Sequence, residues 1–253
     1  MVHEVAAAGF SDPGDYEAAR PSYPPEAVAW FVENLRIAPG ATVVDLAAGT
    51  GKLTRLLVPA GANLIAAEPV DGMRATFREV LPDVPMIATT AEQLAFRDGS
   101  LDAVTIAQAF HWFDEDRAIA ALARAVRVGG RVGLVWNARD RSVPWVNDVW
   151  AIMDRVEKRA PWRDHENWRD SASRDRPGFG PLHSAEFRHE QTITPSAMVQ
   201  RVASVSHVAV LPHAEREAVL EEVRAVLRSD PATRGRDELH VPYRVDCYWF
   251  ERV

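Results

Sequence analysis

The sequence predicts an α/β protein built on a doubly wound, mostly parallel sheet of seven strands, with a small helical cap insertion. The first observation is an apolar strand pattern that runs into a glycine-rich turn and then a helix, over residues 42–54. The second is the alternation of five strand patterns with helical patterns over about a hundred residues, which favours parallel strands joined by helices. The third is a strand-like C-terminus, residues 243–253, which can pair with residues 186–192.

We expect a single domain of 253 residues made of four parts. Residues 1–37 form a helical lid, 38–137 a ligand-binding core, 138–180 the cap insertion, and 181–253 the part that completes the sheet. A hydrophobic content of 47% is enough for one large core.

The composition disfavours several classes of function. A net charge of −7 gives no support to binding of nucleic acid or of an anionic membrane. No apolar run approaches the roughly 18–20 residues of a membrane span, and the N-terminus lacks the basic and apolar stretches of a signal peptide. The single cysteine, Cys247, leaves no internal disulfide and suits a reducing compartment. We therefore expect a cytoplasmic protein, monomer or homodimer, whose partner is a small-molecule substrate.

The chain approaches its core through a proline-rich segment. Residues 20–25 (RPSYPP) cannot be a helix interior, whereas residues 26–35 carry apolar side chains at helical spacing. Tyr16, Arg20 and Tyr23 gather around these prolines. They belong either to a surface segment or to a lid over a ligand, in which Arg20 would meet a carboxylate.

The glycine-rich turn follows Asp45 and contains Ala47, Gly49 and Gly51. Glycines let a backbone approach a ligand closely, and the helix that follows offers free N–H groups. A phosphate-binding P-loop is excluded, because leucines stand where its first glycine and its hydroxyl should be. A dinucleotide fingerprint lacks its third glycine, which is Thr54 here. An ordinary tight turn is a further alternative.

The next strand pattern, residues 63–68, ends in Glu68, nineteen residues beyond Gly49. At this place a carboxylate can accept two hydrogen bonds from a ribose diol. The alternative for Glu68 is a surface acid at a strand end. Met73, in the helix expected over residues 71–80, either packs in the core or covers an adenine ring.

The strand patterns at residues 86–88 and 101–107 follow, and the second of them exits into Gln108, Phe110, His111 and Trp112. Open α/β sheets bind ligands at the carboxyl ends of their strands. His111 is therefore either a site residue or a structural histidine in a half-buried loop. A helix is expected to start after an N-cap at residue 114 and to end at glycines 129–130, with a fifth strand over residues 131–136.

Residues 138–180 depart from the pattern. One helix is expected over residues 146–156, and tryptophans are concentrated in the segment: Trp145, Trp150, Trp162 and Trp168. We interpret the segment as a cap whose aromatic side chains either line an apolar substrate pocket or pack the cap onto the core. Residues 198–205 and 214–227 are expected to be helical.

Taken together, the motifs resemble those of class I methyltransferases that depend on S-adenosylmethionine (SAM), in the broad group that includes trans-aconitate methyltransferase-like enzymes. The resemblance covers nearly the whole chain. Its motifs are ARPSYP (19–24), VVDLAAGTGKLT (43–54), AAEPVDGM (66–73), TAEQLAF (90–96) and AQAFHWFD (107–114). It implies a Rossmann-like fold, a SAM-binding core over residues 38–137, and S-adenosylhomocysteine (SAH) as product. Ala47 replaces the first glycine of the family's turn.

The resemblance also implies a role for each matching residue. Asp45, Gly49 and Gln108 would border the methionine part of SAM, Glu68 its ribose, and Met73 with residues 90–91 its adenine. The full set expected at the cofactor is Tyr16, Arg20, Asp45, Ala47, Gly49, Gly51, Glu68, Met73, Thr90, Ala91 and Gln108. The substrate pocket is expected to be walled by Tyr23, Phe110, Trp112 and Trp136. No metal ligand is expected.

The expected reaction moves a methyl group from SAM to an oxygen or nitrogen atom of a small molecule, with carboxylates among the acceptors. A hydroxyl acceptor would be helped by a base, for which His111 is the candidate. A carboxylate acceptor would need no base, and Arg20 would orient it. Two other classes stay open: a non-catalytic SAM-binding protein and a nicotinamide-dependent oxidoreductase. The missing third glycine and the antiparallel C-terminal strand count against the oxidoreductase.

Overall fold

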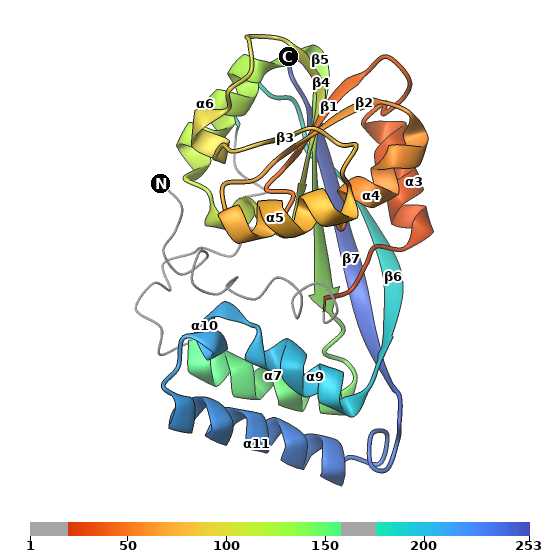
Figure 1. The fold of residues 1–253 in the computed structure, drawn as a ribbon. Coiled ribbons are helices and arrows are strands. Elements are labelled where there is room, and N and C mark those ends of the chain that lie inside the picture. Colours follow the sequence, from red (N-terminus) through yellow and green to blue (C-terminus); the bar gives the residue numbers. More distant parts are fainter. Residues whose placement is uncertain (1–19, 158–175) are drawn as a thin grey trace.

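The computed structural model describes residues 20–157 and 176–253, so the predictions made for Tyr16, Trp162 and Trp168 lie outside the described residues. Seven strands form one sheet in the order β3-β2-β1-β4-β5-β7-β6 (Figure 1). The strands are β1 (Thr42–Leu46), β2 (Asn63–Ala67), β3 (Met86–Ile87), β4 (Leu101–Ala107), β5 (Val126–Arg139), β6 (His183–Ile193) and β7 (Leu239–Glu251).

Strands β1 to β5 pair in parallel, while β7 runs antiparallel to both of its neighbours, β5 and β6. This is the doubly wound, mostly parallel sheet that the sequence predicts. The antiparallel strand β7 lies inside the sheet, and β6 forms the edge. The side chains explain the order. Residues Glu186, Arg188 and Glu190 of β6 are exposed charges that suit an edge strand, whereas β7 buries Val241, Val245 and Phe250.

Helices cover both faces of this sheet (Figure 1). On one face, α3 (Pro25–Asn34) buries Phe31 in a core that includes Val43. On the other face, α6 (Glu115–Ala125) buries Leu122 in a core that includes Val44. Consecutive residues of β1 thus point to opposite faces, as strand alternation requires. The remaining elements of this part are α4 (Thr54–Leu57), α5 (Asp71–Val80) and the 3-10 turns η1 (Val58–Ala60), η2 (Ala91–Gln93) and η3 (Phe110–Trp112).

Helix α6 begins as predicted but ends earlier than the glycines at 129–130. Its N-cap Asp114 accepts a hydrogen bond from the Arg117 backbone N–H, and the backbone becomes extended at Val126, where β5 starts. Gly129 takes a positive φ of 76°, and a Cβ on Gly130 would lie 2.9 Å from the carbonyl oxygen of Asp102. The two glycines therefore serve an irregular stretch of β5 beside β4, rather than a helix terminus.

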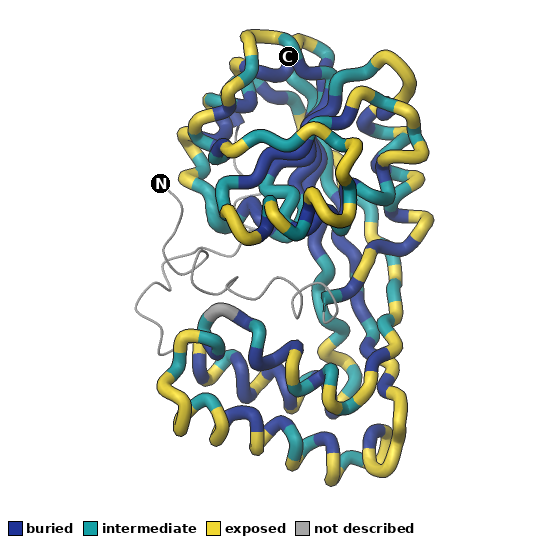
Figure 2. The backbone as a smooth tube through the Cα atoms, in the orientation of Figure 1, coloured by how far each residue is buried: buried dark blue, intermediate teal, exposed yellow. Residues whose placement is uncertain are grey.

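Four helices pack together apart from the sheet (Figure 1): α7 (Pro144–Glu157), α9 (Pro195–Ala203), α10 (Ser206–Ala209) and α11 (His213–Ser229). Their shared core contains Trp150, Met198 and Leu220, together with Val241 and Tyr243 from β7. Figure 2 shows that the outer side of α11 is exposed. The expected cap at 138–180 therefore supplies only α7 among the described residues, because three of the four helices come from the segment assigned to completing the sheet. None of the helices in the described parts of the chain is long and apolar enough to cross a bilayer.

The single cysteine lies in β7, beside the edge strand β6. Cys247 of β7 faces Val135 of β5 and Ala185 of β6 in the strand register. Its side chain is fully buried, and burial raises the pKa of the thiol to about 12. Cys247 therefore behaves as a small apolar core residue.

We expect Gly133→Ala to lower the free energy of unfolding by about 1–3 kcal/mol, the usual cost of overpacking a core. A Cβ on Gly133 of β5 would lie 2.6 Å from Leu35 Cδ1 and 2.7 Å from Phe31 Cε1, so these two buried side chains would have to shift. Urea denaturation measures the change. Gly180→Ala is the matched control, because its Cβ would meet nothing closer than Val253 Cγ1 at 3.4 Å. Equal effects of the two substitutions would contradict this packing.

Candidate functional site

The site is organised around Asp45, a carboxylate buried near the carboxyl end of β1, between β2 and β4. The Thr54 hydroxyl donates a hydrogen bond to Asp45 Oδ2 at 2.5 Å, and the Thr105 hydroxyl donates to Oδ1 at 2.8 Å. Burial raises the pKa of Asp45 from 3.8 to about 6, although both hydrogen bonds lower it. The carboxylate therefore ties the end of β1 to β4 and to the first residue of α4.

The turn after β1 holds three residues in the left-handed region: Ala47 (φ 56°), Gly49 (φ 57°) and Gly51 (φ 87°). Gly51 requires the absence of a side chain, because its Cβ would lie 2.7 Å from Leu81 Cδ1. Ala47 stands where the resemblance expects glycine, and for a non-glycine residue this conformation costs about 1–2 kcal/mol. Strain of this kind concentrates at ligand-binding sites.

Glu68 follows β2 directly and is 5% exposed. Its Oε2 accepts a hydrogen bond from the Gly49 backbone N–H at 3.0 Å, and its Oε1 accepts one from the Val70 N–H at 2.9 Å. Burial raises the pKa of Glu68, while these two N–H donors and the Arg74 charge lower it. The acid that the sequence places near the turn is thus bonded to the turn, and it is not a surface acid.

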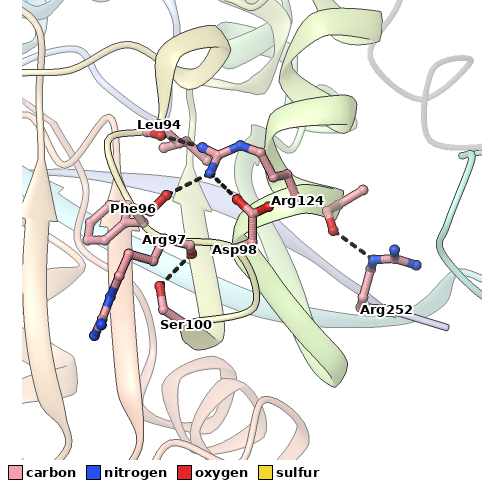
Figure 3. Close-up of polar contacts among 8 residues, drawn as sticks. Leu94, Phe96, Arg97, Asp98, Ser100, Arg124 and Arg252 are labelled. Atoms are coloured by element: carbon pink, nitrogen blue, oxygen red, sulfur yellow. Dashed lines mark hydrogen bonds and ion pairs between the residues drawn. The ribbon is translucent and has the colours of Figure 1, made fainter.

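The other residues expected near an adenine lie close to the sheet. Met73 of α5 is buried, as is Ala91 of η2, which directly follows Thr90. Arg124 of α6 holds the loop after η2 in place. Its guanidinium donates hydrogen bonds to the carbonyl oxygens of Leu94 and Phe96 at 2.6 and 2.7 Å (Figure 3).

A pocket opens beside the glycine turn, at the carboxyl ends of β1, β4 and β5. Its lining joins parts of the chain that are far apart in sequence: Arg20, Pro21, Tyr23, Ala47, Ala48, Gly49, Thr50, Lys52, Leu53, Ala107, Gln108, Asn137, Arg139 and Arg201. Five predicted site residues therefore meet here: Arg20, Tyr23, Ala47, Gly49 and Gln108. Gln108 is itself in the left-handed region, with φ 59°.

Sequence reasoning missed the side of the pocket formed by Asn137, Arg139 and Arg201. The fifth strand was expected to end at residue 136, but β5 runs on to Arg139. The side chains of residues 137 and 139 share the face opposite to residue 136. Strand alternation could therefore have grouped these two residues from the sequence alone. No such pattern was available for Arg201 of α9, because its position at the pocket depends on how the helices pack.

Four predicted residues lie elsewhere. Phe110 and Trp136 are buried in the core between the sheet and α6 and are not in the described lining of this pocket, so their place at the substrate stays a prediction. The reason for Trp136 is strand parity, because it points to the same face as Leu134. Trp112 packs against the same core, and the His111 ring lies 4.9 Å from the Trp112 ring in η3. Neither belongs to the described lining.

Residues 20–157 and 176–253 hold no group of three or more His, Cys, Asp or Glu side chains placed to bind a metal ion. The described site offers hydrogen-bonding carboxylates, a glycine turn and cationic side chains.

Comparisons with known proteins agree with this geometry. The sequence profile of a methyltransferase domain matches residues 44–134, the segment that carries the glycine turn, Glu68 and β4. An uncharacterized methyltransferase of Mycobacterium tuberculosis is 38% identical, over 92% of this chain and 91% of that protein. A solved structure described as a type II methyltransferase, from Anaeromyxobacter dehalogenans, is 25% identical, covers 92% of this chain and 97% of its own, and superposes with a TM-score of 0.64. The fold alone is shared with an N-methyltransferase of Haemonchus contortus solved with SAH, at 14% identity and a TM-score of 0.57, over 95% of this chain and 56% of that one.

We expect Asp45 to make the protein less stable as pH rises from about 4 to about 6. Its folded pKa of about 6 exceeds the ordinary value of 3.8, so the native state binds more protons than the unfolded state in this window. Stability is then lost on ionisation, by about 3 kcal/mol in full.

The measurement compares urea denaturation of the wild type and Asp45→Asn at pH values across this window. The stability of the wild type minus that of the variant should fall as pH rises, because the variant does not titrate there. A difference that stays constant would contradict the raised pKa.

Proposed function

We propose, because this chain belongs to the methyltransferase family, that its methyl donor is SAM and that its acceptor is an oxygen or nitrogen atom of a small molecule. The observation that carries the proposal is the bond between Glu68 and the Gly49 N–H. It places an acid beside a glycine turn at the carboxyl edge of the sheet, which is the arrangement suited to a nucleoside. The adjoining pocket then receives the acceptor.

The residues present fit such a cofactor. Glu68 uses one lone pair of each oxygen in the bonds to Gly49 and Val70, so each oxygen can accept a further hydrogen bond from a ribose hydroxyl. Asp45 and Gln108 flank the turn on the methionine side in this proposal, with Met73, Thr90 and Ala91 near the adenine. Arg20 and Gly51 complete the cofactor shell, and Tyr16 is proposed for it as well.

SAM would supply a methyl group on a positively charged sulfur that leaves readily as a neutral thioether. The residues of this chain then have to hold the acceptor in line and exclude water, and positioning of this kind can contribute roughly 7–11 kcal/mol to lowering the barrier. His111 is proposed as the base for a hydroxyl acceptor, with Trp112 beside it. A carboxylate acceptor would carry no proton to remove.

A nicotinamide-dependent oxidoreductase and a non-catalytic SAM-binding protein are the two other classes that the sequence left open. The family and the position of β7 weigh against the first. Calorimetry with SAM, SAH and NADH separates these classes by ligand, and a methyl-transfer assay on a panel of small acids, alcohols and amines separates an enzyme from a binding protein.

We expect Glu68→Ala to weaken SAH binding by about 1.5–3 kcal/mol, the usual contribution of hydrogen bonds to a charged group. The variant loses both the ribose acceptor and the contact that holds the Gly49 N–H. Isothermal titration calorimetry measures the change. Glu79→Ala, at an exposed position of α5, is the matched control and should bind SAH like the wild type. If Glu68→Ala bound SAH as tightly as the wild type, Glu68 would not be part of the cofactor site.

For a hydroxyl acceptor, we expect His111→Gln to lower turnover by about 10²–10⁴-fold, the usual contribution of a general base. SAH affinity should stay nearly constant, and the acidic limb of the pH–rate profile should disappear. Turnover close to that of the wild type would assign His111 a structural role or indicate an acceptor that needs no base. Loss of SAH binding would instead place His111 in the cofactor shell.

A further inference from the structure

The outer edge of β6 pairs with no other strand within residues 20–157 and 176–253 (Figure 1). The strand is eleven residues long, contains no proline, and keeps an unbroken register with β7 along its whole length. Edge strands that avoid pairing are commonly short, bulged, interrupted by proline or charged. Of these devices β6 uses only charge, so the pattern of its charges decides which strand can pair with it.

The charges on one face of β6 alternate in sign along the strand: Glu186, Arg188 and Glu190. The side chain of Arg188 is 85% exposed, and its Nη1 lies 3.7 Å from Asp140 Oδ2. The side chain of Glu186 is 56% exposed, and its Oε2 lies 3.4 Å from Arg244 Nε. Exposed ion pairs of this kind contribute little to stability. Both groups can therefore turn towards a partner strand at little cost.

The other face of β6 carries an aromatic side chain near the middle of the strand. Phe187 is half-buried, and its ring lies 6.4 Å from the ring of Trp30 in α3, edge to face. Trp30 is also half-buried. Part of the Phe187 ring thus stays exposed on the edge strand, where an aromatic side chain of an added strand can cover it.

We propose that β6 is a homodimer interface, in which the β6 strands of two copies pair antiparallel about a two-fold axis at Phe187. Phe187 then lies opposite the partner's Phe187. Glu186 lies opposite the partner's Arg188, and by symmetry Arg188 lies opposite the partner's Glu186, as an isologous interface requires. Aromatic pairs and opposite charges directly across an antiparallel ladder stabilise the pairing.

The alternating charges disfavour the neighbouring registers. An axis at Arg188 would place the two Arg188 side chains opposite each other and Glu186 opposite the partner's Glu190, so that like charges meet at every pair. An axis one residue further along would match Arg188 with the partner's Glu190 but would separate the two Phe187 rings. Specific pairing depends on such mismatches as well as on favourable contacts. The order of side chains in β6 thus favours one symmetric register.

The test measures the mass of the full-length protein by sedimentation equilibrium over a series of concentrations from micromolar upwards. We expect the wild type to form a dimer as concentration rises. Arg188→Glu turns both ion pairs into like-charge pairs and should weaken dimerisation by about tenfold or more. Adding Glu186→Arg to that variant restores opposite charges and should recover association. Arg78→Glu, at an exposed position of α5, is the matched control and should dimerise like the wild type.

Introduced cysteines then test the register. Phe187→Cys places two thiols directly opposite each other across the axis, close enough for a disulfide. Mild oxidation should therefore join two copies, as seen on a non-reducing gel after free thiols are blocked. His189→Cys lies on the same face, but its two thiols would be four residues apart along the strands, about 13 Å, so it should not cross-link. Cys247 is buried and does not compete.

Each other outcome overturns a stated part. A wild type that stays monomeric at every concentration, or an Arg188→Glu variant that dimerises as well as the wild type, overturns the interface. Failure of the charge swap to recover association, or cross-linking through residue 189 in place of residue 187, overturns the register. Circular dichroism of each variant checks that it is folded. None of these measurements uses SAM, so their result is separate from that of the proposed function.

Discussion

The antiparallel pairing of β5 with β7 is the interaction on which the rest of the structure depends. Its register runs from Arg131 opposite Glu251 to Arg139 opposite Tyr243. At one end the ladder lies in the sheet between α3 and α6, and at the other end Tyr243 belongs to the core of the helical group. The pocket takes residues from both parts, so this ladder fixes the distance between its two sides. Helices joined to the sheet by loops alone would not hold Arg201 at a constant place.

Most of the elements could be predicted from the sequence, because their patterns are local. The helix over Asp71–Val80 and the strand over Leu101–Ala107 have the expected bounds, and Asp45, Gly49 and Glu68 come together as their spacing indicated. The predicted C-terminal end of α6 was wrong, because a glycine pair can occur in an irregular strand as well as at a helix terminus. The assembly of α7 with α9, α10 and α11 could not be predicted, since it depends on tertiary packing of segments separated by a long stretch of chain. Arg201 was missed for the same reason.

The site concentrates features that oppose stability. Ala47 is held in a left-handed conformation, Asp45 is ionised in a buried position only above its raised pKa, and Arg139 lies near a second arginine. None of these is required to form a seven-stranded sheet, and most of the other buried residues are apolar. Local costs of this kind are typical of positions kept for binding. The distribution of strain therefore points to the same edge of the sheet as the pocket does.

The position of Cys247 has a practical consequence for chemical labelling. A thiol reacts as its thiolate, and a pKa of about 12 together with complete burial leaves almost none at neutral pH. In the folded protein Cys247 should therefore not react with maleimide dyes or oxidants. The thiol becomes reactive when β7 leaves the sheet. Cysteines introduced at exposed positions of β6 or α11 can carry a fluorophore pair without removing the native residue, and the reactivity of Cys247 itself then reports global unfolding.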